Sequence, residues 1–182
     1  MPERSLRLFF ALPCPRPLAD RIGRWRDGQA LPGCPVATEN LHLTLAFLGQ
    51  LPATRLDALR DMAATIKEPP FDIRLDRLLR WRNGILSLAP GQPPGALLRL
   101  QRALRFGLAA LELPPESRPF SPHLTLARHA APLEDAQPPP TFVWQAEHFD
   151  LLRSETAPTG VHYLSLGRWA LRGENSNARF AP

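Results

Sequence analysis

The pentapeptide His42-Leu-Thr-Leu-Ala46 occurs a second time, unchanged, as His123-Leu-Thr-Leu-Ala127, eighty-one positions further along the chain. Leucine is abundant in this sequence, but histidine occurs only five times among 182 residues. Identical pentapeptides that both begin with histidine are therefore hard to attribute to chance. The repeat indicates that the chain builds one half of a site and then builds it again.

Polar and apolar residues alternate in both copies, a pattern typical of a half-buried β-strand. Because residues two apart in a strand share a face, His42, Thr44 and Ala46 are expected on one surface and the leucines on the other. The same division holds for the second copy, in which His123 and Thr125 share a face with the alanine at 127. Each copy thus offers an imidazole and a hydroxyl, anchored by a row of leucines in a core.

The segments around the two copies predict a series of further strands and helices. Asn83-Gly84 is a strong signal for a β-hairpin, and a second turn is expected at residues 158–160. Prolines at 114, 115 and 119 should end the last helix, and residues 132–140 form a proline-rich loop. Strands are expected at residues 6–12, 71–79, 85–88, 142–154 and 161–171, and helices at 15–29, 52–66 and 94–111.

This order of elements favours an α+β fold. The helices are too few for a doubly wound parallel sheet, and the hairpin signals favour antiparallel pairing. We expect two pseudo-symmetric antiparallel sheet lobes with outer helices around a central cleft, which the two histidine strands would line. Residues 1–172 would form this single bilobal domain, and residues 173–182 a polar C-terminal tail.

The composition is that of a globular protein with one good core, since 44% of the residues are hydrophobic. The formal net charge is +5, and Lys67 is the only lysine among the basic residues. The planar guanidinium group of arginine suits bidentate contacts with phosphate. The alternative explanation for the excess of arginine over lysine is a genomic base composition that favours arginine codons.

Cys14 and Cys34 are too few for a disulfide framework and lack the spacing of metal ligands. No stretch approaches the length needed to span a membrane, and the apolar run at residues 8–12 is too short for a signal peptide. These features predict a cytoplasmic protein without membrane contact. Nothing in the sequence suggests an obligate interface, so we expect a monomer.

Two imidazoles that face one cleft can perform acid–base catalysis without a metal. Imidazole titrates near pH 6.5, so one ring can accept a proton from a nucleophile while the other donates one to a leaving group. Thr44 and Thr125 would approach the substrate from opposite sides, which suits a centre with two equivalent non-bridging oxygens, such as a phosphodiester. Arg128 could offset the phosphate charge, but strict alternation points it toward the leucine row unless the strand ends or bulges there.

Other interpretations of these residues were weighed. A metal site is possible, but two histidines without a nearby Asp, Glu or Cys fall short of the usual three or four ligands. His129, His148 and His162 have no repeated partner and are interpreted as structural or surface residues. Two basic–aromatic clusters could touch a nucleotide but are more often solvated faces; they are Trp81 with Arg77, Arg80 and Arg82, and Trp25 with Arg24 and Arg26.

The duplicated His-x-Thr-x motif resembles the signature of the 2H phosphoesterases, and the flanking sequence resembles one branch, the RNA 2′,3′-cyclic phosphodiesterases, also called 2′-5′ RNA ligases. The resemblance covers nearly the whole chain. The matching segments are residues 7–12, 39–49, 120–128 and 163–171.

The resemblance implies a bilobal fold and hydrolysis of an RNA 2′,3′-cyclic phosphate end to a 2′-phosphomonoester, with no metal or other cofactor. It implies that His42 is the proton donor to the 3′ oxygen and His123 the proton acceptor that activates water. Thr44 and Thr125 would hold the phosphate oxygens with the assistance of Arg128. The reverse of this chemistry would join a cyclic phosphate end to a 5′ hydroxyl.

Two competing functions stay open. The protein could act on another cyclic phosphate, such as a small nucleotide or an ADP-ribose cyclic phosphate, because the histidine–threonine frame reads the phosphate and not the base. It could also be a binding module for RNA ends that has no turnover.

Overall fold

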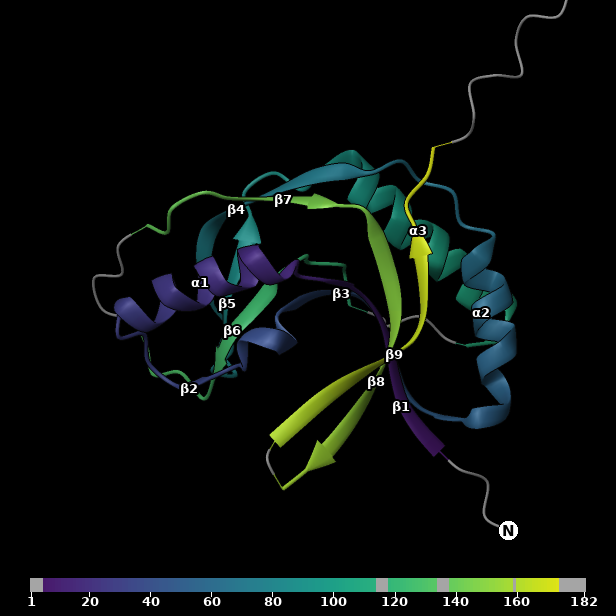
Figure 1. The fold of residues 1–182 in the computed structure, drawn as a ribbon, viewed down its shortest axis with the longest axis horizontal. Coiled ribbons are helices and arrows are strands. Elements are labelled where there is room, and N and C mark those ends of the chain that lie inside the picture. The colour runs from purple at the N-terminus through teal and green to yellow at the C-terminus, as the bar shows by residue number, and fades with distance from the viewer. Residues whose placement is uncertain (1–4, 114–117, 134–137, 159, 174–182) are drawn as a thin grey trace, which may run out of the picture.

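The computed structural model describes residues 5–113, 118–133, 138–158 and 160–173 (Figure 1). Some of the predictions concern residues outside these ranges. They are the prolines at 114 and 115, residues 134–137 of the proline-rich loop, Thr159 and the tail beyond residue 173. The strands found in the described part are β1 (Ser5–Pro13), β2 (Cys34–Pro35), β3 (His42–Pro52), β4 (Phe71–Arg80), β5 (Leu86–Pro90), β6 (Leu124–Arg128), β7 (Phe142–Ala146), β8 (His148–Ala157) and β9 (Gly160–Ala170). The helices found there are α1 (Arg16–Gly28), α2 (Leu56–Ala64) and α3 (Gly95–Ala110), with short 3₁₀ turns η1 (Thr38–Asn40) and η2 (Ala53–Arg55).

The strands form one curled antiparallel sheet in the order β7-β4-β5-β6-β3-β1-β8-β9, and β2 pairs with β6 beside this path. The strands that carry the repeated pentapeptide, β3 and β6, are the central neighbours, with three further strands on each side. They meet through the pair Leu43 and Leu124. The predicted α+β fold with antiparallel lobes is confirmed, and the two lobes are the halves of a single sheet.

The helices flank both halves, with α1 beside the β4–β7 side and α2 and α3 beside the other (Figure 1). Helix α1 follows Pro15 and has a proline in its first turn, where the missing N–H costs nothing. Helix α3 buries the predicted leucine stripe, namely Leu97, Leu100, Leu104 and Leu108. None of the described helices has the length and hydrophobicity that a membrane span requires.

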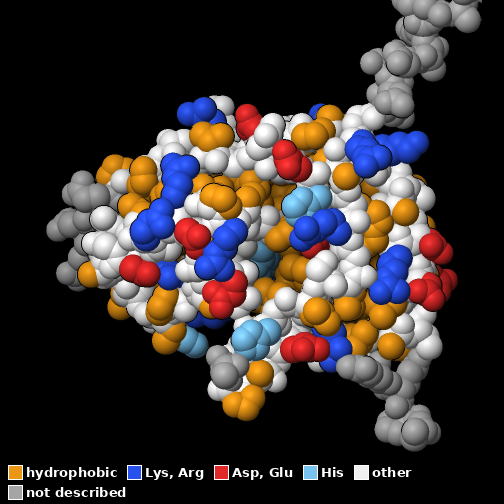
Figure 2. Space-filling view, viewed as in Figure 1, with side chains coloured by type: hydrophobic (Ala, Val, Ile, Leu, Met, Phe, Trp, Pro, Cys, Tyr) orange, Lys and Arg blue, Asp and Glu red, His pale blue; other side chains and the backbone are white. Residues whose placement is uncertain are grey.

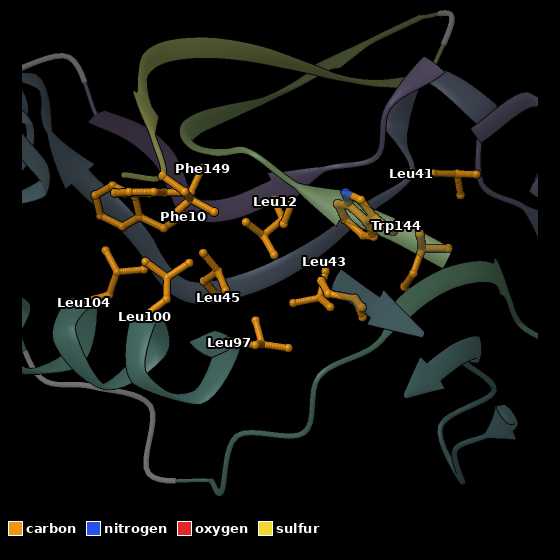
Figure 3. Close-up of a cluster of buried hydrophobic side chains, with 14 of the residues drawn as sticks. Phe10, Leu12, Leu41, Leu43, Leu45, Leu97, Leu100, Leu104, Trp144 and Phe149 are labelled. Carbon is orange, nitrogen blue, oxygen red and sulfur yellow. The ribbon is translucent and has the colours of Figure 1, made fainter. Parts of the chain in front are cut away.

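The main hydrophobic core lies between the helices and one face of the sheet (Figure 3). Leu43 and Leu45 of the first pentapeptide point into it toward Leu97, Leu100 and Leu104 of α3 (Figure 3). Leu124 and Leu126 of the second copy belong to the same cluster and are fully buried. The predicted leucine rows therefore anchor the two central strands from one side and leave the other face of the sheet free for a cleft.

The strand predicted at residues 142–154 is wrong as a single element. Strand β7 pairs with β4, whereas β8 pairs with β1 in the other half of the sheet. The residues that belong to the main core change from even numbers, such as Trp144 and Ala146, to odd numbers, such as Phe149 and Leu151. The chain crosses between halves at Glu147, and the change of phase in the core positions accompanies this crossing.

Candidate active site

The two copies of the motif lie side by side and run in opposite directions. Leu43 is the Cα partner of Leu124 in the antiparallel pair of β3 and β6. In such a pair, the residue after one partner lies opposite the residue before the other, so Thr44 faces His123, and His42 likewise faces Thr125. Both leucines are buried in the core. The two histidines and two threonines therefore share the opposite face, around a pseudo-twofold axis.

Both imidazoles are held in the same way. The Nδ1–H of His42 donates to the backbone carbonyl of Asn40 at 2.7 Å, and that of His123 donates to the carbonyl of Ser121 at 2.8 Å. A carbonyl oxygen only accepts hydrogen bonds, so each contact fixes the proton on Nδ1 in the neutral ring. Each Nε2 atom is thereby left as the nitrogen that can exchange a proton with a substrate.

The surroundings of His42 are apolar. Its ring centroid lies 5.1 Å from that of Phe9 and 5.0 Å from that of Tyr163, which meets it edge-on. Loss of hydration lowers the pKa of His42 to about 4, although the hydrogen bond to the Asn40 carbonyl opposes this shift. The positive charges of Arg128 and His123 lower this pKa further. The ring is neutral at pH 7, and its Nε2 lies 3.1 Å from Thr44 Oγ1.

His123 packs against a different aromatic side chain, that of Trp81. The two ring centroids are 5.2 Å apart. The indole Nε1–H donates to Ser87 Oγ at 3.1 Å, which fixes the plane of the Trp81 ring. The sequence contains two basic–aromatic clusters. The tryptophan of one, Trp81, lies beside His123, whereas the tryptophan of the other, Trp25, packs edge-on against Phe142.

Arg128 reaches the cleft because strand β6 bulges. Ser87 pairs with Thr125 but Leu86 pairs with Ala127, so Leu126 is an extra residue on β6. A bulge shifts the alternation by one position. Ala127 consequently joins a buried cluster, against the prediction from strict alternation, and the side chain of Arg128 lines the cleft.

The same bulge occurs in the first copy. Ala11 pairs with Thr44 but Phe10 pairs with Ala46, so Leu45 is the extra residue on β3. Ala46 packs against the main core, whereas the alternation placed it on the face of His42 alone. The structure corrects the prediction at this position too.

Phe47 consequently occupies the position that corresponds to Arg128, and 43% of its surface is exposed. The Arg7 guanidinium carbon lies 4.9 Å from the centroid of its ring. Phe47 was not among the predicted site residues, although it precedes Arg128 by the same eighty-one positions that separate the two pentapeptides.

Two cavities lie beside the pair of histidines and share part of their lining. We name them the His42-side cavity, of about 750 Å³, and the His123-side cavity, of about 590 Å³, after the histidine that lines each one. Figure 2 shows basic, acidic and histidine side chains gathered around the middle of the displayed face. The residues that line both cavities are Arg7, Thr44, Phe47 and Arg128.

The remaining predicted residues fall in different places. Thr125 is half-buried beside His123 and does not line either cavity. His129 and His162 are exposed and line the His42-side cavity. His148 lies elsewhere, 3.9 Å from the buried carboxylate of Asp150. Within the described ranges, no three His, Cys, Asp or Glu side chains lie close enough together to hold a metal ion.

Comparisons with known proteins agree on one family. The model of the 2′-5′ RNA ligase superfamily matches residues 14–158. The RNA 2′,3′-cyclic phosphodiesterase of Escherichia coli is 40% identical over 170 residues, which cover 91% of this chain and 96% of that protein. The RNA 2′,3′-cyclic phosphodiesterase of Thermus thermophilus is 38% identical over 78% of this chain and 77% of its own length. The crystal structure of E. coli LigT complexed with 3′-AMP superposes with a TM-score of 0.86 at 37% identity and covers 92% of this chain and 99% of that one.

Proposed function

The chain belongs to the 2′-5′ RNA ligase superfamily, and we propose that it hydrolyses RNA 2′,3′-cyclic phosphate ends to 2′-phosphomonoesters by acid–base catalysis between His42 and His123. The observation that carries the mechanism is the pair of identically held imidazoles across the Leu43–Leu124 contact. The names of the E. coli and T. thermophilus relatives support the substrate class.

In the proposed reaction, His123 Nε2 accepts a proton from water as the water oxygen attacks phosphorus. The bond between phosphorus and O3′ breaks on the opposite side, and His42 Nε2 donates a proton to O3′. The phosphate stays on O2′. Each proton transfer of this kind typically contributes about 10²–10⁴ in rate.

Donation by His42 requires a proton that its ring lacks in the free protein at pH 7. A phosphodiester anion bound beside the ring favours the protonated imidazole and raises its pKa. Binding of the substrate is therefore accompanied by uptake of a proton from solvent onto His42, and this is the proton that O3′ receives. After turnover His42 is neutral and His123 carries the proton taken from water, which His123 releases to solvent before the next cycle.

Thr44, Thr125 and Arg128 are proposed to hold the phosphate. The hydroxyl groups donate to its non-bridging oxygens, and the Arg128 guanidinium offsets the negative charge that grows in the transition state. The support for Arg128 is its place in both cavities, next to the two histidines. The exposed ring of Phe47 offers a stacking surface for the terminal base, and the volume of the His42-side cavity suits a nucleotide. We expect the protein to act as a cytoplasmic monomer without a metal or other cofactor.

The test is hydrolysis of an RNA oligonucleotide that ends in a 2′,3′-cyclic phosphate, in EDTA, with chemical mapping of the product end. We expect a 2′-phosphate and at least a roughly 100-fold loss in His42→Ala and in His123→Ala. His148→Ala, a histidine away from both cavities, is the matched control and should retain activity. Loss of activity in EDTA would indicate a metal enzyme. Binding of the RNA end without turnover would indicate a binding module, and a preference for a mononucleoside cyclic phosphate over the oligonucleotide would indicate a small-nucleotide enzyme.

A further inference from the structure

Asn40 is a buried polar residue just before the first histidine strand. Only 9% of its surface is exposed, and it ends the short 3₁₀ turn η1. Its Nδ2–H donates to the backbone carbonyl of Val161 in β9 at 2.6 Å, although the two residues are 121 positions apart in the chain. A buried amide requires a hydrogen-bond partner, and the partner here belongs to a distant element. The side chain therefore ties the turn before His42 to β9.

The backbone of the same residue holds the proposed acid. The carbonyl oxygen of Asn40 accepts the Nδ1–H of His42 at 2.7 Å. In the second copy, the equivalent carbonyl belongs to Ser121, and that residue is exposed. The residue that anchors His42 is thus buried and fixed by its own side chain, whereas the residue that anchors His123 lies at the surface. The two copies of the motif differ here, on the side of the proposed proton donor.

Within the sheet, the segment that Asn40 contacts is paired on one side only. Strand β9 lies at the edge of the sheet, and Val161 pairs with Thr156 of β8. The pairing of β8 with β1 stops at Ser154, so this end of the β8–β9 hairpin projects from the sheet (Figure 1). An edge strand leaves a row of backbone groups unpaired. The Asn40 amide gives the hairpin a second attachment, at the Val161 carbonyl.

The position of this hairpin affects His42 directly. Tyr163 lies two residues after Val161, and its ring meets that of His42 edge-on with the centroids 5.0 Å apart. Asn40, Val161 and Tyr163 all line the His42-side cavity. A shift of the hairpin would therefore change both the packing around His42 and the shape of the cavity that is proposed to bind the terminal nucleotide.

We propose that Asn40 is a positioning residue for the proposed acid, with its carbonyl holding the Nδ1 proton of His42 and its amide holding the hairpin that packs on the same ring. The inference rests on the proposed function and gives a role to a residue that does not touch the reacting atoms. Displacement of a reacting group by about 1 Å can cost about 10²-fold in rate. Loss of the amide should therefore slow proton donation to O3′ and leave proton acceptance by His123 unchanged.

Two substitutions separate the hydrogen bond from the space that the side chain fills. Asn40→Ala removes the amide and keeps the backbone carbonyl. Asn40→Asp fills nearly the same space but places an ionised carboxylate opposite the Val161 carbonyl, and two acceptors form no hydrogen bond. The added negative charge alone would favour the protonated, donating form of His42. A loss of activity in Asn40→Asp therefore reports the lost hydrogen bond.

Ser165→Ala is the matched control in the same hairpin. The Ser165 hydroxyl donates to Asp150 at 2.9 Å, and Ser165 lines neither cavity. The substitution therefore removes a side-chain hydrogen bond from β9 without changing the contacts of His42.

The experiment compares kcat and KM for two RNA oligonucleotides that end in a 2′,3′-cyclic phosphate, one with oxygen and one with sulfur at the bridging 3′ position. A thiolate leaves without protonation, so the sulfur substrate does not need the proton from His42. We expect both Asn40 variants to lower kcat about tenfold on the oxygen substrate, with KM within about threefold of wild type, and to change kcat by less than about twofold on the sulfur substrate. Ser165→Ala should stay within about twofold of wild type on both substrates.

The comparison of the two substrates excludes a loss of folded protein as the cause. The ratio of the two rates in one preparation does not depend on how much of the protein is folded. A double variant tests the same claim independently. Asn40→Ala/His42→Ala should be no slower on the oxygen substrate than His42→Ala, because a residue that acts through His42 has no further effect once that ring is absent.

Three results would overturn the inference. One is an equal loss on both substrates, which would show that Asn40 only supports the structure. Another is a kcat on the oxygen substrate that stays within about twofold of wild type in both Asn40 variants. The third is a multiplicative loss in the double variant. Failure of the wild type to hydrolyse either RNA, or failure of His42→Ala to recover on the sulfur substrate, would instead refute the proposed function or its acid.

Discussion

At the scale of single residues, the two imidazoles are anchored alike but surrounded differently. Each donates through Nδ1 to the carbonyl two residues earlier. His42 lies between Phe9 and Tyr163, whereas His123 lies against Trp81. Identical pentapeptides therefore present the same nitrogen in unequal environments, which is the asymmetry that a donor and an acceptor require.

Alternation in the sequence predicted which face His42, Thr44, His123 and Thr125 share, because β-strand geometry alone determines it. It could not predict the apolar surroundings of His42, since the aromatic residues around it come from β1 and β9. The low pKa of His42 is therefore a property of the folded chain, not of the motif.

The apolar surroundings of His42 predict a pH dependence of stability. Its pKa is about 4 in the folded protein and about 6.5 in an unfolded chain, so between these values the unfolded state binds more protons. The free energy of unfolding should therefore fall as the pH is lowered from 7 to 4, by up to about 3 kcal/mol from this group. The measurement is denaturant unfolding of the wild type and of His42→Gln at pH 7 and at pH 4. The difference in the free energy of unfolding between the two proteins should be larger at pH 7 than at pH 4.

Subtracting the value for the variant from that for the wild type removes the contribution of His148. Burial and the positive charge of Arg168 lower the pKa of that histidine as well. A wild-type advantage that stays constant with pH, or grows in acid, would contradict a neutral His42 ring in apolar surroundings.

At the scale of elements, the bulges in β3 and β6 decide what reaches the cleft. Each bulge adds one leucine to its strand, and the residues that follow therefore change sheet face. Phe47 and Arg128 reach the cleft for this reason. Gly33 approaches the backbone of this region so closely that a Cβ atom there would lie 2.5 Å from the Arg128 carbonyl oxygen, and its φ of +101° also favours glycine. The sequence indicated the strands but not the bulges, because a bulge depends on the register with neighbouring strands.

The side chain of Arg26 in α1 contacts the β6 bulge, and this contact leads to a prediction about activity. Its buried Nη1 donates to the carbonyl oxygens of Val36 at 2.5 Å and of Leu126, the bulged residue, at 3.4 Å. Arg26→Met leaves these carbonyls without that donor, so we expect Arg128 to be displaced and kcat to fall about tenfold, with a smaller loss in Arg26→Lys. Steady-state kinetics of these variants and of Arg26→Met/Arg128→Ala give the measurement.

If Arg26 acts through Arg128, the double variant should be no slower than Arg128→Ala alone. Multiplicative losses would show that Arg26 affects activity by another route.

At the scale of the whole molecule, one hydrophobic core holds the two halves of the sheet in register. The halves touch through Leu43 and Leu124 in the sheet, but a single buried cluster extends through both of them. The repeat predicted the pseudo-symmetry, since two copies of a strand motif imply two copies of its supporting lobe. It did not predict that the lobes share a core, because the crossing at Glu147 depends on pairings far apart in the sequence.

The shared core predicts that both halves unfold together. Tryptophan fluorescence and far-ultraviolet circular dichroism should follow one denaturant transition. Leu124→Ala, at the joint, should shift that single transition by about 2–5 kcal/mol. Two separated transitions, or a Leu124→Ala effect confined to one of them, would show that the halves are independent units.

In the proposed mechanism, His42 donates a proton and His123 accepts one. The most direct measurement is turnover of a cyclic substrate in which sulfur replaces the bridging 3′ oxygen, because a thiolate leaves without protonation. His42→Ala should lose about 10²–10⁴ in rate on the oxygen substrate and recover most of it on the sulfur substrate, whereas His123→Ala should be slow on both. Recovery by His123→Ala instead would reverse the two roles, and recovery by neither variant would contradict the acid–base pair.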